Sequence, residues 1–160
     1  MKVPFIDLVK QNTPLKKKIT QSFLKVLNSG QYILGNELKS FEDNFKKYIG
    51  TKFCVGVGSG TDALYLALKA IDLKKNEEVI TVSQSYLASA SCINLAGGKI
   101  RFVDIKNDLN INDELISKNI NKNTKAIIIV HLTGRPVNIK NIKKIINNSK
   151  HSQKIYIIED

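Results

Sequence analysis

Short apolar runs recur along the chain from residue 52 onward, and longer amphipathic stretches separate them. Strands that alternate with helices in this way form α/β domains with a mostly parallel sheet. The run AIIIV is apolar at consecutive positions, which is typical of a strand buried on both faces. The sequence therefore predicts an α/β fold with a mostly parallel sheet between helices. The five predicted strands are FCVGV (53–57), EVITV (78–82), KIRFVD (99–104), KAIIIV (125–130) and KIYII (154–158).

Helical periodicity predicts two helices ahead of the first strand, at 15–28 and, with Asn36 as N-cap, at 37–49. Apolar residues recur there every three or four positions, so each helix has one apolar face. Gly30 and Gly50 lie just past the two ends, where a left-handed residue commonly terminates a helix. Four more helices are predicted between the apolar runs, at 61–72, 87–96, 112–119 and 138–148.

The length of 160 residues and the hydrophobic share of 42% suit one compact domain with an ample core. No run approaches the roughly 20 apolar residues of a membrane span, and the start lacks the features of a secretory signal. Cys54 and Cys92 do not make a disulfide framework, and no Cys or His accompanies them at metal-ligand spacing. We therefore expect a cytoplasmic protein that holds no metal.

The net charge of +11 raises the question of a nucleic-acid or membrane partner. Of the 25 basic residues, 23 are Lys, and only Arg101 and Arg135 carry the planar fork that base and phosphate recognition favours. A solvated lysine surface is therefore the preferred interpretation, with no nucleic acid and no membrane as partner. A nucleotide- or polyanion-binding module remains an alternative function.

Ligands of open α/β sheets bind at the carboxyl ends of the strands, which draws attention to the segment GVGSGTD at 56–62. Its glycines allow a tight turn, and the helix that follows offers free N–H groups to an anion. The spacing matches neither the dinucleotide fingerprint nor a Walker loop. A capping box of Ser59 and Asp62, with no ligand at all, explains the segment equally well.

Three further segments follow predicted strands. Tyr86 in SQSYLASA can stack on a flat ligand or pack within its own domain. His131 in HLTG can act as an acid or base or donate to a neighbouring carbonyl. Asp160 in IIED needs a cationic partner or hydrogen-bond donors if it is desolvated, or it belongs to a solvated acid pair.

The order of these segments resembles the DegT/DnrJ/EryC1/StrS family of pyridoxal-phosphate-dependent aminotransferases, which act mainly on nucleotide-linked keto sugars. The matching segments span essentially all 160 residues. The resemblance implies a fold type I aminotransferase large domain whose sheet ends here after its fifth strand. The segments that match the family are VPFIDL, SGQYILG, ELKSFEDNF, VGSGTDALYLAL, EVITVSQSYLASASCI, FVDI, HLTGRP and IIED.

Carried over to this chain, the resemblance implies a cofactor site for pyridoxal 5′-phosphate. Gly60 and Thr61 would hold the phosphate, Tyr86 would stack on the pyridine ring, and Asp160 would pair with the ring nitrogen. An ionised Asp keeps that nitrogen protonated, which strengthens the electron sink of the ring. Thr133 stands where the family has an aromatic residue in HLTG, so this segment carries no substrate inference.

None of the 23 lysines stands in the context of the family's Schiff-base Lys. We therefore assign no catalytic residue within 1–160 and expect these residues to be the amino-terminal part of the cofactor-binding large domain. The carboxyl-terminal remainder and a small domain would be absent, so the 160-residue chain is expected to be inactive alone.

The resemblance implies a homodimer when full length, acting in amino-sugar biosynthesis on a nucleotide sugar with Glu or Gln as amino donor. A sugar dehydratase that uses the same cofactor, or a non-catalytic regulatory relative, is the alternative within the same fold. The polyanion-binding module is the alternative from another class, and it predicts binding that falls steeply with salt.

Overall fold

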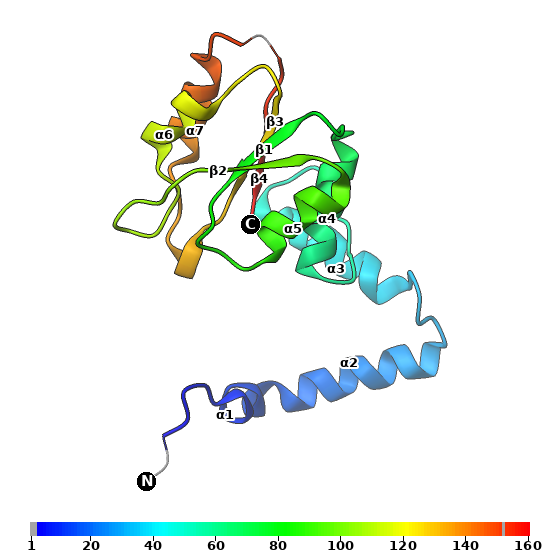
Figure 1. The fold of residues 1–160 in the computed structure, drawn as a ribbon. Coiled ribbons are helices and arrows are strands. Elements are labelled where there is room, and N and C mark those ends of the chain that lie inside the picture. The colour runs from blue at the N-terminus through cyan, green and yellow to red at the C-terminus, as the bar shows by residue number, and fades with distance from the viewer. Residues whose placement is uncertain (1–2, 152) are drawn as a thin grey trace. The chain divides into compact units, whose positions relative to one another are not determined.

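A four-stranded parallel sheet organises the carboxyl-terminal part of the chain (Figure 1). The computed structural model describes residues 3–151 and 153–160. The strand order is β2-β1-β3-β4, so β1 and β3 are central. Val79 of β1 lies opposite Ile100 of β2 and Ala126 of β3 in the register. The strands are β1 (Glu78–Thr81), β2 (Lys99–Phe102), β3 (Thr124–Ile129) and β4 (Tyr156–Glu159).

Helices cover both faces of this sheet (Figure 1). Alternate residues of the central strands face opposite ways: Val79 and Ile128 pack with α4 and α5, whereas Ile80 and Ile127 pack with α6 and α7. Consecutive apolar residues are therefore buried on both sides, which confirms the interpretation of the AIIIV run. These helices are α4 (Gly60–Ala70), α5 (Ala88–Ala96), α6 (Asp113–Asn119) and α7 (Ile139–Asn147), and a 3₁₀ turn, η2 (Leu132–Gly134), precedes α7.

The prediction of FCVGV, the first of the five strands expected, is wrong. Residues 53–57 form no strand, and Phe53 and Val55 are largely exposed. A strand is defined by its ladder to a neighbour, and within the described residues no segment pairs with this one. Among residues 3–151 and 153–160, the sheet therefore has four strands rather than five.

The residues divide into two compact units, Met1–Gly56 and Val57–Asp160, rather than the single compact domain expected from length. The amino-terminal unit holds only helices, and none of its described residues is buried. Its helices are α1 (Leu8–Asn12), the 3₁₀ turn η1 (Thr13–Leu15), α2 (Lys16–Ser29) and α3 (Asn36–Ile49).

The six helices expected from periodicity are confirmed, with small shifts at their ends. Gly30 and Gly50 take left-handed conformations, with φ of 66° and 80°, and end α2 and α3. The N-cap of α3 is Gly35 rather than Asn36, which is the first helical residue. Within residues 3–151 and 153–160, no helix combines the length and the apolarity that crossing a membrane requires.

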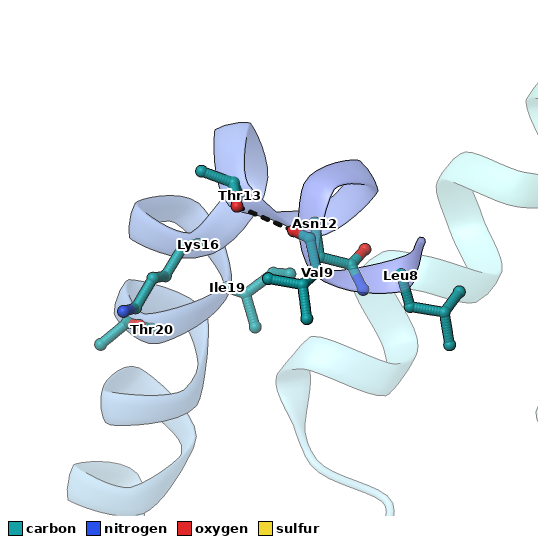
Figure 2. Close-up of a pocket in the computed structure, with 7 residues that line it drawn as sticks. All are labelled: Leu8, Val9, Asn12, Thr13, Lys16, Ile19 and Thr20. Atoms are coloured by element: carbon teal, nitrogen blue, oxygen red, sulfur yellow. Dashed lines mark hydrogen bonds between the residues drawn. The ribbon is translucent and has the colours of Figure 1, made fainter. Parts of the chain in front are cut away.

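An open cavity of about 420 Å³ lies between α1 and the start of α2 (Figure 2). The figure shows Leu8, Val9 and Ile19 at this cavity, and Thr13 donates a hydrogen bond from Oγ1 to the Val9 carbonyl at 2.7 Å. All three apolar side chains are more than half exposed. The cavity includes none of the four predicted site residues.

An ion pair joins strands at the amino edge of the sheet. The Glu78 carboxylate of β1 accepts hydrogen bonds from the Arg101 guanidinium of β2 and from the Asn121 amide. The Arg101 hydrogen bond holds the pKa of Glu78 below its ordinary value of 4.5, and the Asn121 hydrogen bond acts in the same direction against desolvation. The Glu78 side chain is only 14% exposed, so this pair is shielded better than a surface pair.

Glu78→Gln is expected to lower the free energy of unfolding by about 1–2 kcal/mol at pH 7, because it removes the charge that two donors face. A depressed folded-state pKa stabilises the fold above the unfolded value, and this contribution disappears as pH falls through the folded value. The difference between parent and variant should therefore shrink below about pH 4.5. Urea unfolding from pH 3 to pH 7 measures it, with the exposed Glu114→Gln as control. A pH-independent difference would contradict the ion-pair account.

Candidate cofactor site at the carboxyl edge of the sheet

Gly60 and Thr61 are the first two residues of α4. Ser59 is the N-cap: its Oγ accepts the N–H of Asp62 at 3.1 Å and donates to the Asp62 carboxylate at 3.0 Å. The first N–H groups of a helix have no acceptor within the helix. Ser59 satisfies that of Asp62, whereas within residues 3–151 and 153–160 no acceptor bonds the N–H of Gly60 or of Thr61. The cap and the anion site, which were alternatives in the sequence, are therefore compatible.

The start of α4 lies toward the carboxyl edge of the sheet. The helix ends at Ala70 and is joined by residues 71–77 to the amino end of β1. Its Leu64 and Leu68 belong to the buried cluster that includes Val79 of β1, and a helix that leads into a strand of a parallel α/β sheet runs opposite to that strand. Its 11 residues span roughly 16 Å at 1.5 Å per residue, about the length of the neighbouring strand. The positive end of the helix dipole thus lies at the edge where strands deliver their loops.

Tyr86 lies in the loop that leads from the carboxyl end of β1 into α5. Its side chain is 80% exposed, so the structure does not support the alternative that it packs within its own domain. The backbone around it is fixed, because its carbonyl accepts the N–H of Ser89 at 3.1 Å. An exposed aromatic ring on an ordered loop is suited to a flat ligand.

Asp160 follows β4 at the same edge, and its backbone extends the ladder to β3. Its N–H donates to the Ile129 carbonyl at 2.8 Å, and its carbonyl accepts the N–H of His131 at 3.0 Å. Its Oδ2 accepts a hydrogen bond from Ser89 Oγ at 2.9 Å. Glu159 and Asp160 are both exposed, as the interpretation of a solvated acid pair allowed, and the Asp160 carboxylate is in addition tied to the first turn of α5.

The buried thiol of Cys92 lies near the Asp160 carboxylate. Cys92 of α5 is fully buried, and burial, with a further contribution from the negative charge of Asp160, raises its pKa to about 11. The group is therefore a neutral thiol at pH 7 and packs as a small apolar side chain. Cys54 is also free but is partly exposed.

The ring of His131 links two segments at this edge through its two nitrogens. Its Nδ1 accepts the backbone N–H of Val137 at 3.0 Å, and its Nε2 lies 3.2 Å from Glu159 Oε2. A ring that accepts at Nδ1 carries its proton on Nε2 and donates that proton to Glu159. The ring therefore connects the loop after β3 to the end of β4 and donates to a carboxylate, whereas the backbone N–H of His131 is the group that donates to a carbonyl, that of Asp160.

The loop after β3 holds two consecutive left-handed residues, Thr133 with φ of 57° and Gly134 with φ of 77°. A β-branched residue in this region is strained, typically at a cost of about 1–3 kcal/mol. Thr133 Oγ1 donates to the Leu132 carbonyl at 2.7 Å, a local bond that accompanies the turn. The loop is thus held in a defined shape beside Asp160.

Hydrogen bonds join three of the four predicted segments at this edge, because SQSYLASA and HLTG each bond to Asp160 of IIED. Within the described residues, Ser89 is the link between Asp160 and the loop of Tyr86, whereas no hydrogen bond joins Thr61 to Tyr86 or to Asp160. Sequence reasoning did not single out Ser89. The available signal was a hydroxyl residue in the first turn of a small-residue helix that follows a strand.

Comparison with known proteins gives strong matches. The model of the DegT/DnrJ/EryC1/StrS aminotransferase family matches residues 14–160. The dTDP-3-amino-3,6-dideoxy-alpha-D-galactopyranose transaminase of Aneurinibacillus thermoaerophilus is 40% identical over 144 residues, which are 89% of this chain and 40% of that protein.

Solved structures agree with the sequence matches. DesV of S. venezuelae, crystallised in complex with a ketimine intermediate, has a TM-score of 0.90 and 34% identity over 98% of this chain and 42% of that chain. The GDP-4-keto-6-deoxy-D-mannose-3-dehydratase of E. coli, with bound hydrated PLP, has a TM-score of 0.80 and 33% identity over 88% of this chain and 37% of that one. The chain spans about two fifths of the length of the curated relatives it matches.

Proposed function

Because the chain belongs to the DegT/DnrJ/EryC1/StrS aminotransferase family, we propose that the carboxyl edge of its sheet binds pyridoxal 5′-phosphate for amino transfer to a nucleotide-linked keto sugar. The observation that carries the proposal is the Asp160 carboxylate, which is tied by Ser89 to the loop that presents Tyr86. Asp160, Tyr86 and the start of α4 are suited to the ring nitrogen, the ring face and the phosphate of one molecule.

Gly60 and Thr61 would hold the phosphate through their backbone N–H groups, and Thr61 would add its hydroxyl. A dianion is stabilised at the start of a helix by both the free N–H groups and the dipole. Gly60 leaves the approach open, because a Cβ built there would meet no atom within 4 Å. Asp62 is exposed and already bonded to Ser59, so its charge is partly satisfied next to this site.

Tyr86 and Asp160 would hold the ring. Tyr86 offers an exposed aromatic face for stacking. Asp160 would keep a proton on the ring nitrogen through a charge-assisted hydrogen bond, which is about twice as strong as a neutral one. When bound, pyridoxal phosphate supplies the carbon that carries the amino group and the ring that accepts electrons from the bond being broken. In this proposal the described residues would bind and orient the cofactor and would hold a proton on its ring nitrogen.

The transaminase of Aneurinibacillus thermoaerophilus supports a nucleotide-linked sugar as the substrate of the whole protein, and Glu or Gln remains the proposed amino donor. The dehydratase of E. coli supports a second candidate, sugar dehydration with the same cofactor. A homodimer is proposed for the whole protein. The apolar faces of α2 and α3 support it, since Phe23 and Phe41 are both more than half exposed in this chain.

Titration of the chain with pyridoxamine 5′-phosphate tests the cofactor proposal. This form lacks the aldehyde and does not react with the many surface lysines. We expect saturable binding, followed by fluorescence, that is at least about tenfold tighter than binding of pyridoxamine, because the free N–H groups of a helix start favour a phosphate. Thr61→Ala is expected to remove part of this preference.

Salt separates this proposal from a polyanion-binding module. Binding in a built pocket should change little between 50 mM and 200 mM salt, whereas binding through summed lysine charge should fall steeply. Equal affinity for pyridoxamine and its phosphate, or a steep salt dependence, would count against the cofactor site.

A further inference from the structure

Two serine hydroxyls form a continuous line with the Asp160 carboxylate. Ser89 Oγ lies 2.9 Å from Asp160 Oδ2, and Ser85 Oγ lies 2.8 Å from Ser89 Oγ. Ser89 is 1% exposed and occupies the second position of α5, whereas Ser85 lies within the loop that leads from β1 to α5. The Ser89–Asp160 bond joins residues 71 positions apart in the chain.

The charge of Asp160 fixes the direction of both bonds. A carboxylate only accepts, so the single proton of Ser89 is directed at Asp160 Oδ2. Ser89 Oγ then has only lone pairs to offer, and the Ser85 hydroxyl must donate to it. The chain of bonds therefore runs from Ser85 through Ser89 to Asp160, and each bond polarises the next.

These bonds leave one oxygen of Asp160 for a ligand. Its backbone is held on β3 by the bonds to Ile129 and His131, and Oδ2 is held by Ser89. Within residues 3–151 and 153–160, no donor bonds to Oδ1. The Asp160 side chain is thus held in place at its backbone and at Oδ2, whereas Oδ1 remains available to a ligand.

We propose that Ser89, supported by Ser85, is a positioning residue that orients the Asp160 carboxylate so that Oδ1 meets the protonated ring nitrogen of the cofactor. The inference rests on the proposed function of this edge. Without the Ser89 hydroxyl, the Asp160 side chain would lose its constraint and rotate among its rotamers. Its loss would weaken the hydrogen bond to the ring nitrogen and leave the contacts to the phosphate and to the ring face unchanged.

A pair of ligands isolates that bond. Pyridoxamine 5′-phosphate carries the ring nitrogen, and its 1-deaza analogue has C–H at that position and cannot pair with Asp160. For Ser89→Ala we expect roughly tenfold weaker binding of pyridoxamine 5′-phosphate, the size expected for one hydrogen bond to a charged group. Binding of the deaza analogue should stay within about twofold of the parent chain, since its remaining contacts are unchanged.

Three variants complete the experiment. Ser89→Thr keeps the hydroxyl and should restore most of the affinity, and Ser85→Ala should give a smaller loss of about two- to threefold, because it acts through one more bond. Ser91→Ala is the matched control: it removes a hydroxyl from the same helix, where no bond to Asp160 exists. Circular dichroism melts establish that each variant is folded.

The outcomes separate this inference from the proposed function. If the parent chain binds neither ligand, the proposed function fails, and the inference fails with it. If the parent chain prefers the nitrogen-bearing ligand and Asp160→Ala abolishes that preference, but Ser89→Ala leaves it intact, only the positioning role is overturned. Equal losses for both ligands in Ser89→Ala would likewise overturn it in favour of a merely structural role.

Discussion

Replacing Asp160 by alanine is expected to weaken binding of pyridoxamine 5′-phosphate roughly 10- to 100-fold, the range for a hydrogen bond between charged groups. The carboxylate is the only proposed contact to the ring nitrogen, and its backbone and Oδ2 are already held in place. Little reorganisation is therefore needed on binding, which leaves most of the interaction free energy for affinity. Fluorescence titration of parent and variant at one salt concentration measures the ratio.

Glu159→Ala is the matched control for this prediction. It removes one negative charge from the neighbouring position, where the carboxylate contacts His131 at 3.2 Å rather than pointing to a ligand. We expect less than about a threefold change in affinity, since an exposed charge acts only weakly at a distance. Equal losses in Asp160→Ala and Glu159→Ala would show that general charge, and not a bond to the ring nitrogen, accounts for binding.

The second large effect concerns the core under the site. Leu68 of α4 is fully buried in the cluster with Val79 and Ile128, so Leu68→Ala is expected to lower the free energy of unfolding by about 3–4 kcal/mol. That loss is a large fraction of the 5–15 kcal/mol typical of a domain. Denaturant unfolding followed by far-ultraviolet circular dichroism measures it.

Leu66→Ala makes the same chemical change two positions earlier in the same helix. Leu66 is 47% exposed, so we expect a loss below about 1 kcal/mol. A similar loss in both variants would mean that α4 does not pack on the sheet through the Leu68 side. The start of α4 would then have no fixed place at the carboxyl edge, and the phosphate site would lose its basis.

Much of the fold could be predicted because its signals are local. The run AIIIV indicated a strand buried on two faces, and Ile127 and Ile128 indeed pack on opposite sides of the sheet. Gly30 and Gly50 marked helix ends because a left-handed residue is needed there. The segment 53–57 has equally good strand composition, yet a strand forms only where a neighbour completes its hydrogen bonds.

The residues of the candidate site could be predicted from the sequence, but the hydrogen bonds between them could not. Tyr86 and Asp160 stood out because they lie within four residues after apolar runs, and parallel strands bring such loops to one edge. The bond from Ser89 to Asp160 could not be foreseen, because it joins residues 71 positions apart and depends on how α5 packs. Likewise, the ring orientation of His131 is set by Val137 and Glu159, which local sequence does not reveal.

The most direct test of the account is a crystal structure of this chain grown with pyridoxamine 5′-phosphate. The account predicts one bound molecule in unit Val57–Asp160, with its phosphate on the N–H groups of Gly60 and Thr61, its ring against Tyr86 and its ring nitrogen at Asp160 Oδ1. A molecule bound elsewhere on the chain, or one whose ring nitrogen lies beyond hydrogen-bond distance of Asp160 while Ser89 keeps its bond to Oδ2, would contradict it.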